Sequence, residues 1–170
     1  MSILDYIFPK QCIFCSKIGE YICKECIKKL PRALPCCCIC KTLSNEGNVH
    51  SKCKFTDINI KYLRGWYKGR DIYKELEKKL NSSLFSYHIF LIKLLTIQLD
   101  IQDYIVLPLE SSKYGRLNII LAKEVSMTTQ FKRDTKRVCL VGFKIEDIEI
   151  VKKQILHLKY IQEVLIITVL

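Results

Sequence analysis

The sequence is poor in glycine, with six among 170 residues, and this scarcity limits the kinds of ligand site it can form. Loops that cradle phosphate need glycines, which let backbone N–H groups converge, and hydroxyls or a lysine as further donors. Segment 136–154, "KRVCLVGFKIEDIEIVKKQ", is typical of a strand, a short loop and a helix, yet the helix opens with Glu146, Asp147 and Glu149. The loop therefore lacks the groups that hold a phosphate.

Long hydrophobic runs are also missing. The most apolar segment, 83–99, is interrupted by His88 and Lys93 and is shorter than the roughly 20 apolar residues that span a bilayer. The beginning, "MSILDYIFPKQC", has an acid at Asp5 and no basic region followed by a long apolar run, so we expect no signal peptide. There is no G-x-S-x-G motif for a hydrolase nucleophile. We therefore expect a cytoplasmic protein without a transmembrane segment.

Acidic residues are outnumbered, since 28 Lys and Arg face 17 Asp and Glu and leave a net charge of +11. Such an excess favours a polyanionic partner, either nucleic acid or an anionic membrane surface. The alternative is a basic surface that is only solvated. Bound zinc would change this little: a site of four thiolates carries −2 and a site of three thiolates and one histidine −1, so the charge falls from +11 to +8.

Cysteine is the abundant residue, with ten in the chain. Without a signal peptide, this number indicates metal binding rather than disulfides. Four pairs share a two-residue gap, which lets one tight turn present both ligands to a tetrahedral Zn²⁺. A single such pair could be a redox motif, but four pairs outside a βαβ unit argue against it. We predict two zinc ions held by Cys12, Cys15, Cys23, Cys26, Cys37, Cys40, His50 and Cys53.

The pairing of these ligands has two solutions. Consecutive pairing gives one site from the first four cysteines and a mixed site that includes His50, whereas a crossed arrangement stays open. In "CCCIC", Cys38 could replace Cys37 only by shortening the gap to one residue, so Cys36 and Cys38 are expected to be bystanders. Because apolar residues between the pairs are few, the metal should supply most of the folding energy of this part.

Composition divides the chain near residue 56. Nine of the ten cysteines lie before it, so 1–56 is predicted to be a metal-organised module and 57–170 an α/β domain. Alternating strand-like and helix-like runs in 57–170 predict right-handed crossovers and a parallel sheet, with ligands bound near 109–115 and 142–147. The expected strands are 58–68, 103–109, 137–143 and 163–170, and the expected helices are 71–80, 84–99, 113–126 and 145–158.

Several motifs follow one another in a known order: "LDYIFPKQCIFC", the cysteine pairs, "LRGWYKGRDIYKELEKKL", "IVLPLESSKYGRLNIILAK" and "KRVCLVG". This layout resembles the ComF family. The resemblance implies a double zinc ribbon followed by a type I phosphoribosyltransferase-like domain, and a role in bacterial natural competence and DNA uptake. It also implies that the protein could be peripheral to the inner membrane through the uptake machinery.

The chain departs from the family at the motif that binds phosphoribosyl pyrophosphate (PRPP). There the family has two acids after a strand and then a Thr-Thr-Gly loop. Here Gly142 and Phe143 replace the acids, and Glu146, Asp147 and Ile148 replace the loop. Carboxylates near a phosphate are unfavourable, because like charges at about 4 Å repel by about 1 kcal/mol even in water.

Connection 127–136 is also shorter than in the family, so part of the cover over such a site is missing. We expect a truncated domain with a degenerate loop that binds no PRPP. The alternative is an ordinary strand-to-helix connection in an unrelated fold, whose acids favour the positive end of the helix.

These observations favour a non-enzymatic zinc protein of natural transformation, which contacts single-stranded DNA or proteins of the DNA-uptake machinery on the cytoplasmic side. The alternatives are a zinc-dependent protein adaptor without nucleic-acid binding and an atypical active phosphoribosyltransferase. Segment 61–70 mixes aromatic and basic residues, on which bases could stack. The DNA-contact candidates are Arg64, Trp66, Lys68 and Arg70. Tyr62 shares a strand face with Arg64 and Trp66.

Overall fold

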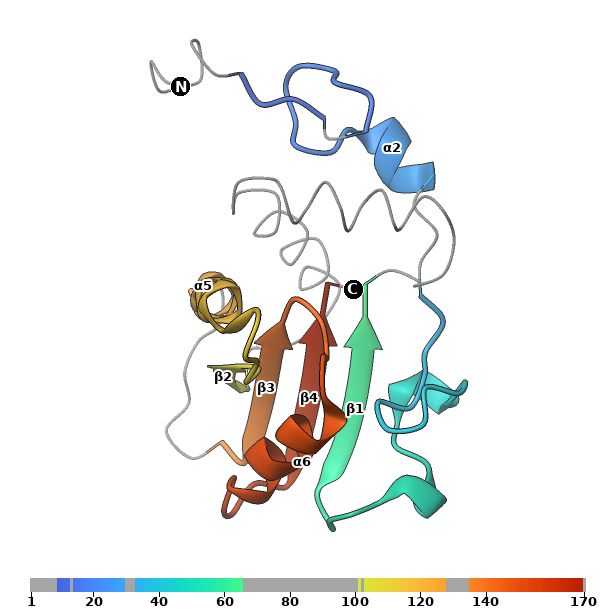
Figure 1. The fold of residues 1–170 in the computed structure, drawn as a ribbon, viewed down its shortest axis with the longest axis vertical. Coiled ribbons are helices and arrows are strands. Elements are labelled where there is room, and N and C mark those ends of the chain that lie inside the picture. Colours follow the sequence, from blue (N-terminus) through green and yellow to red (C-terminus); the bar gives the residue numbers. More distant parts are fainter. Residues whose placement is uncertain are drawn as a thin grey trace.

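The computed structural model describes residues 9–12, 14–29, 33–65, 101, 103–127 and 135–169 (Figure 1). In these residues the fold is mixed α/β and is built on a four-stranded sheet in which every pair of neighbours is parallel. The strand order is β1-β4-β3-β2. The strands are β1 (Asn59–Arg64), β2 (Ile105–Pro108), β3 (Arg137–Gly142) and β4 (Glu163–Thr168). The parallel sheet predicted from the alternating pattern is confirmed.

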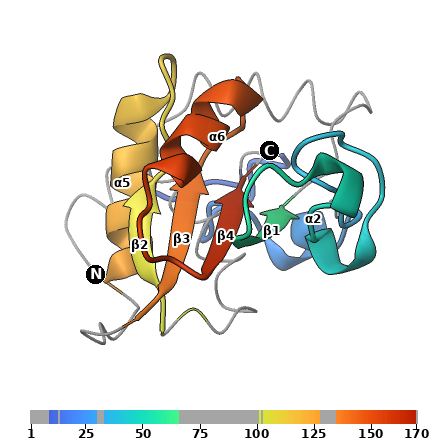
Figure 2. The same ribbon diagram turned by 90° about the horizontal axis from the view of Figure 1, so that it is seen from below.

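After their first residues, Arg137 and Glu163, the two inner strands are buried because both faces of the sheet are covered. Helix α5 (Gly115–Ser126) packs on the face that carries Cys139 and Val141, and α6 (Ile148–Leu156) packs on the face that carries Leu140. Figure 2 shows α5 running beside β2 and α6 lying over the inner strands. The core is therefore two apolar layers separated by the sheet.

One expectation about the connections is wrong. Strands β2, β3 and β4 are neighbours in chain order, but α5 and α6 lie on opposite faces, so the two crossovers cannot both be right-handed. The buried Asn118 holds α5 on its face. Its side-chain amide donates to Leu109 O at 2.7 Å, and its Oδ1 accepts from Phe143 N at 2.8 Å.

Several elements differ from expectation in their bounds or their burial. Strand β2 was expected to be buried, but its four residues are only partly buried because it is the outermost strand. Helix α6 begins at Ile148 rather than 145, because Asp147 caps it by accepting a hydrogen bond from Glu149 N at 2.8 Å. Strand β1 ends at Arg64, and the expected helices 71–80 and 84–99 lie outside the described residues.

The segment before β1 packs directly against the sheet. Val49 N donates to Ile60 O at 3.1 Å, next to an antiparallel bridge between Asn48 and Lys61. Gly47 lies so close that a Cβ atom there would be 2.1 Å from the carbonyl oxygen of Tyr62. Cys36 and Cys38 join the hydrophobic cluster under α6, so residues 36–55 share a core with the sheet. The division at residue 56 stays a prediction.

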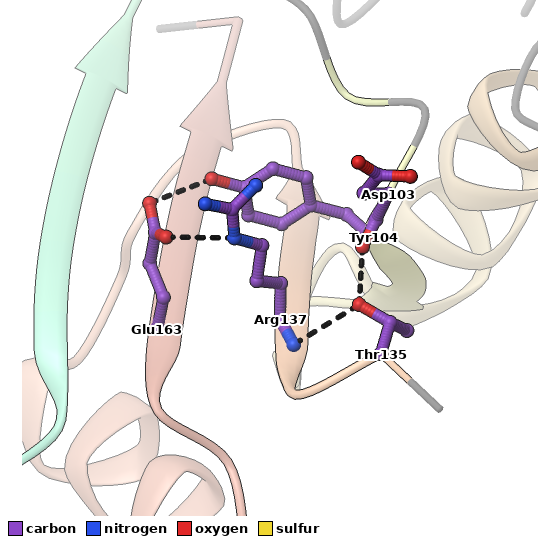
Figure 3. A network of polar contacts seen from close by, with 5 residues as sticks. All are labelled: Asp103, Tyr104, Thr135, Arg137 and Glu163. Atoms are coloured by element: carbon purple, nitrogen blue, oxygen red, sulfur yellow. Dashed lines mark hydrogen bonds and ion pairs between the residues drawn. The ribbon is translucent and has the colours of Figure 1, made fainter. Parts of the chain in front are cut away.

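A polar network ties together the amino ends of three strands (Figure 3). The Tyr104 hydroxyl donates to one Glu163 carboxylate oxygen at 2.6 Å, and Arg137 Nε pairs with the other at 3.1 Å. Thr135 links Asp103 O to the backbone N–H of Arg137. Burial and the bond to Glu163 raise the pKa of Tyr104 well above its usual range, so the hydroxyl stays a donor.

None of the helices in the described part of the chain combines the length and apolar character needed to cross a membrane.

Candidate metal centres

The first ligand cluster is formed by a tight turn and the beginning of a helix. Cys12 and Cys15 lie in a turn closed by a bond from Ser16 N to Cys12 O at 2.8 Å. Cys23 precedes α2 (Lys24–Lys29), and Cys26 lies in the first turn of this helix. One donor atom from each cysteine lies within 4.8 Å of the others, so the four predicted ligands come together.

The second cluster has the same design with one histidine. Cys37 and Cys40 lie in a turn closed by a bond from Lys41 N to Cys37 O at 2.9 Å. His50 and Cys53 come from a short 3-10 segment, η2 (Ser51–Cys53), which follows a similar segment, η1 (Asn45–Gly47). Their donor atoms also lie within 4.8 Å of one another, so consecutive pairing is the arrangement the structure adopts.

The two turns are structural repeats displaced by 25 residues. Ser16 and Lys41 both have left-handed backbone, with φ of 59° and 61°. The isolated bridge between Gln11 and Ile18 corresponds to the one between Cys36 and Leu43. Beyond the cysteine pairs this repeat is not visible in the sequence, because neither left-handed position is a glycine.

The dimensions of both clusters fit a tetrahedral metal ion. With a metal–sulfur bond of about 2.3 Å, two thiolates of a tetrahedron lie about 3.8 Å apart. Cys15 Sγ and Cys23 Sγ are 3.6 Å apart, and Cys40 Sγ is 3.3 Å from His50 Nδ1. His50 Nε2 lies 2.9 Å from Leu43 O and can donate to it, which leaves Nδ1 free to bind a metal. Both clusters could therefore hold metal ions.

Thiol acidity within each cluster is uneven. Burial opposes ionisation of Cys12, but bonds from backbone N–H groups, Cys23 N first among them, lower its pKa to about 6. Bonds with Thr42 lower the pKa of Cys40 to about 6. Burial and neighbouring thiols raise the pKa of Cys26 to about 12 and that of Cys53 to about 11. Several thiolates in one place repel one another, and a divalent cation removes that obstacle.

The remaining cysteines of the described chain lie apart from the two ligand clusters. Cys36 and Cys38 are 4% and 0% exposed and pack with Ile60 and Tyr62, so they serve as core residues. Burial raises the pKa of Cys38 and that of Cys139, in β3, to about 12. Among the described residues, neither thiol lies in a group of side chains that could hold a metal ion.

The loop in the position of the PRPP motif is filled by its own side chains. Phe143 is fully buried and meets the Tyr114 ring at 4.9 Å between centroids, so it points into the core. Asp147 is occupied in capping α6, and Ile148 packs against the cluster beneath that helix. The five residues of the degenerate loop thus have structural contacts of their own.

Glu146 crosses from this loop to the loop after β2. Its carboxylate accepts from the Ser111 hydroxyl and from Lys113 N, the latter at 3.2 Å. A hollow of about 430 Å³ lies beside this contact, with Leu109, Gly115 and Ile119 in its largely apolar lining. Glu146 therefore occupies the hydrogen-bond donors of Ser111 and Lys113, which a bound anion would need at this end of the sheet.

Of the four DNA-contact candidates from the sequence, only Arg64 lies in the described residues. Trp66, Lys68 and Arg70 lie outside them, and Arg64 is a partly buried residue at the end of β1. Tyr62, grouped with them as a possible stacking residue, is only 2% exposed, and its hydroxyl lies 3.0 Å from that of Thr168. It cannot stack on a base because the metal-binding segment covers it.

No protein-family model, curated protein or solved structure matches this chain. The resemblance to the ComF family stays a prediction that rests on the motifs quoted above.

Proposed function

We propose that this chain is a zinc-binding protein without catalytic activity that contacts single-stranded DNA. The observation that carries the proposal is the net charge of +11. The chain that carries this charge also contains two clusters of four metal-binding side chains. Zinc in both clusters would still leave +8, enough to attract a nucleic acid and release counterions on binding.

Zinc is the proposed metal because of the donor atoms. One cluster offers four sulfurs and the other three sulfurs and an imidazole nitrogen, which are the usual sets of structural zinc sites. In each proposed zinc site the chain itself would supply all four ligands of the metal. Such closed sites stabilise a fold and leave no position for a substrate, which agrees with a role in binding rather than catalysis.

We propose that the chain is not a catalyst because of the residues that lie at the carboxyl ends of its strands. A phosphoribosyltransferase needs acids, hydroxyls and a glycine there, whereas this chain has a buried Phe143 and a Glu146 bonded to Lys113 N. A phosphate at this place would have to displace a carboxylate and would meet its charge.

The pathway is proposed from the ComF resemblance alone. It assigns the protein to natural transformation, where it would handle incoming DNA on the cytoplasmic side, in contact with the DNA-uptake machinery. The motifs from "LDYIFPKQCIFC" to "KRVCLVG" support this assignment.

A labelled single-stranded oligonucleotide, titrated at 50 and 200 mM salt with and without chelator, tests the function. We expect affinity to fall steeply as salt rises, because each released counterion contributes to the slope, and to fall again when metal is removed. No binding at 50 mM salt would exclude the proposal.

A protein adaptor is the second candidate, and one observation favours it. Ile18 and Leu43 occupy equivalent positions in the two repeated turns, and each is 67% exposed. Exposed apolar residues at matched sites suit contact with a protein. The adaptor would show no salt-dependent binding of DNA, whereas an atypical phosphoribosyltransferase would bind PRPP.

A further inference from the structure

Tyr160 combines two unusual features. Its side chain is 90% exposed, more than any other large hydrophobic residue of the described chain. Its backbone is left-handed, with φ of 65°, a conformation that glycine adopts freely and that is unfavourable for a bulky residue. A turn alone would be better served by glycine. A large ring held in solvent at a strained position therefore indicates a role in contacting a partner, since it does not stabilise the fold.

The surroundings of Tyr160 are basic. Lys159 precedes it, and both Lys136 and Lys159 are exposed. Gln162 N donates to Lys136 O at 2.8 Å, which places the beginning of β3 beside the turn that carries Tyr160. Arg137, with half of its side chain exposed, comes next in β3. The backbone thus brings two basic segments next to the turn that carries this aromatic ring.

Two acids lie near this region: Asp103, whose carbonyl oxygen accepts from Thr135, and Glu163, whose carboxylate is already engaged. Both carboxylate oxygens of Glu163 have partners, Tyr104 on one and Arg137 on the other (Figure 3). Arg137 also lies over the Tyr104 ring, with Cζ 5.6 Å from its centroid. The negative charge of Glu163 is therefore already compensated by Arg137. It would repel a phosphate that approaches Lys136 and Lys159 only weakly.

We propose that Lys136, Lys159 and Tyr160 form a surface that binds single-stranded DNA. The Tyr160 ring stacks on an unpaired base, and the two lysine side chains contact the phosphates on either side of it. This is the pairing of aromatic ring and cationic track that single-stranded sites use. A duplex hides the faces of its bases and would gain only the charge contacts. The inference rests on the proposed function and names its surface.

The sharpest variant is Tyr160→Gly, because folding and binding should respond differently. Glycine relieves the left-handed strain, so stability should stay equal or rise, while loss of the ring should weaken oligo(dT) binding by roughly 5- to 100-fold. Tyr160→Phe keeps a ring and should bind within about twofold of the unchanged protein. Fluorescence anisotropy measures the affinities, and thermal unfolding measures the stabilities.

A charge-matched pair tests the cations. Lys136→Glu should weaken oligo(dT) binding and reduce the salt slope, whereas Arg116→Glu, exposed in the first turn of α5 at the opposite end of the sheet, should change the slope less. Both variants are measured as full chains loaded with zinc.

Each outcome of these titrations decides the inference. Equal binding by the unchanged protein and Tyr160→Gly would overturn this surface and leave the proposed function standing. No oligo(dT) binding by the unchanged protein would overturn both. Duplex bound as tightly as oligo(dT), with no effect of Tyr160→Gly, would show charge attraction without stacking. Tighter binding of oligo(U) than of oligo(dT) would assign the surface to RNA and overturn its assignment to DNA.

Discussion

Gly142 occupies a position where even a methyl group would collide with its neighbours. A Cβ atom there would lie 2.8 Å from Leu109 Cβ and 3.3 Å from Asn118 Nδ2. The sequence presented this glycine as the loss of an acid. In the structure it lets β2 and α5 approach the end of β3, so the departure from the PRPP motif is part of the packing.

Replacing Gly142 by alanine should therefore destabilise the protein. We expect a loss of about 1–3 kcal/mol in the free energy of unfolding, because Leu109 Cβ is too close to the backbone to move away cheaply. Urea denaturation checks this value. Gly115→Ala is the matched control, since nothing lies within 4 Å of a Cβ atom at that helical position, and it should be neutral or stabilising. Equal effects of the two substitutions would contradict the packing argument.

Asn118 illustrates what a sequence alone leaves open at a single position. In the sequence it is one residue of "IVLPLESSKYGRLNIILAK", while in the structure it is fully buried and bonded to both Leu109 O and Phe143 N. Its partners lie 9 and 25 residues away, and spacing along the chain does not predict such contacts.

Elements with a strong local signal were predicted well. The apolar runs of β3 and β4, the amphipathic pattern of α6 and the paired ligands all lie within short windows of sequence. Features that depend on distant partners were not foreseen. Tyr62 was expected to share a face with stacking residues, but it is buried because the metal-binding segment packs over β1. The opposite faces chosen by α5 and α6 likewise follow from tertiary contacts.

The two metal clusters should differ in their effect on the sheet. Cys40→Ser should lower the stability of the whole fold, because the segment it anchors supplies Cys36 and Cys38 to the core under α6. Cys23→Ser should unfold the turn and helix α2 around the first cluster and loosen the core under α5, because Cys12, Ile22 and Cys23 belong to that core. Hydrogen exchange of α5 and α6 amides distinguishes the two results. Cys38→Ala is the control, since it alters the packing but should keep two metal ions.

The intact protein should contain about two zinc ions per chain, with an affinity that depends on pH. Cys26 and Cys53, with pKa values of about 12 and 11, are protonated at neutral pH without metal and must lose their protons when zinc binds. Affinity should therefore fall as pH falls, about tenfold per unit for each proton released. Metal analysis and zinc titrations at pH 6, 7 and 8 under reducing conditions measure both. A stoichiometry of zero would refute the assignment of the clusters.

The molecule as a whole should not bind PRPP, and introducing threonine at Glu146 and Asp147 should not create a site. The double substitution removes the carboxylate from Lys113 N but leaves Phe143 in the core and Gly142 under steric constraint. Each missing polar contact costs about 1–3 kcal/mol, so most of the deficit would persist. Calorimetry with PRPP and Mg²⁺ provides the measurement. Micromolar binding by the unaltered protein would restore the enzyme hypothesis.

The bridge between Asn48 and Lys61 has a consequence for the behaviour of the protein without metal. Strand β1 ends the sheet on one side, and residues 47–49 cover part of its open backbone immediately before the ligand His50. An uncovered outer strand is a template for pairing with another chain. Loss of the second metal ion would therefore expose a surface prone to aggregation, and the cluster protects solubility as well as local folding.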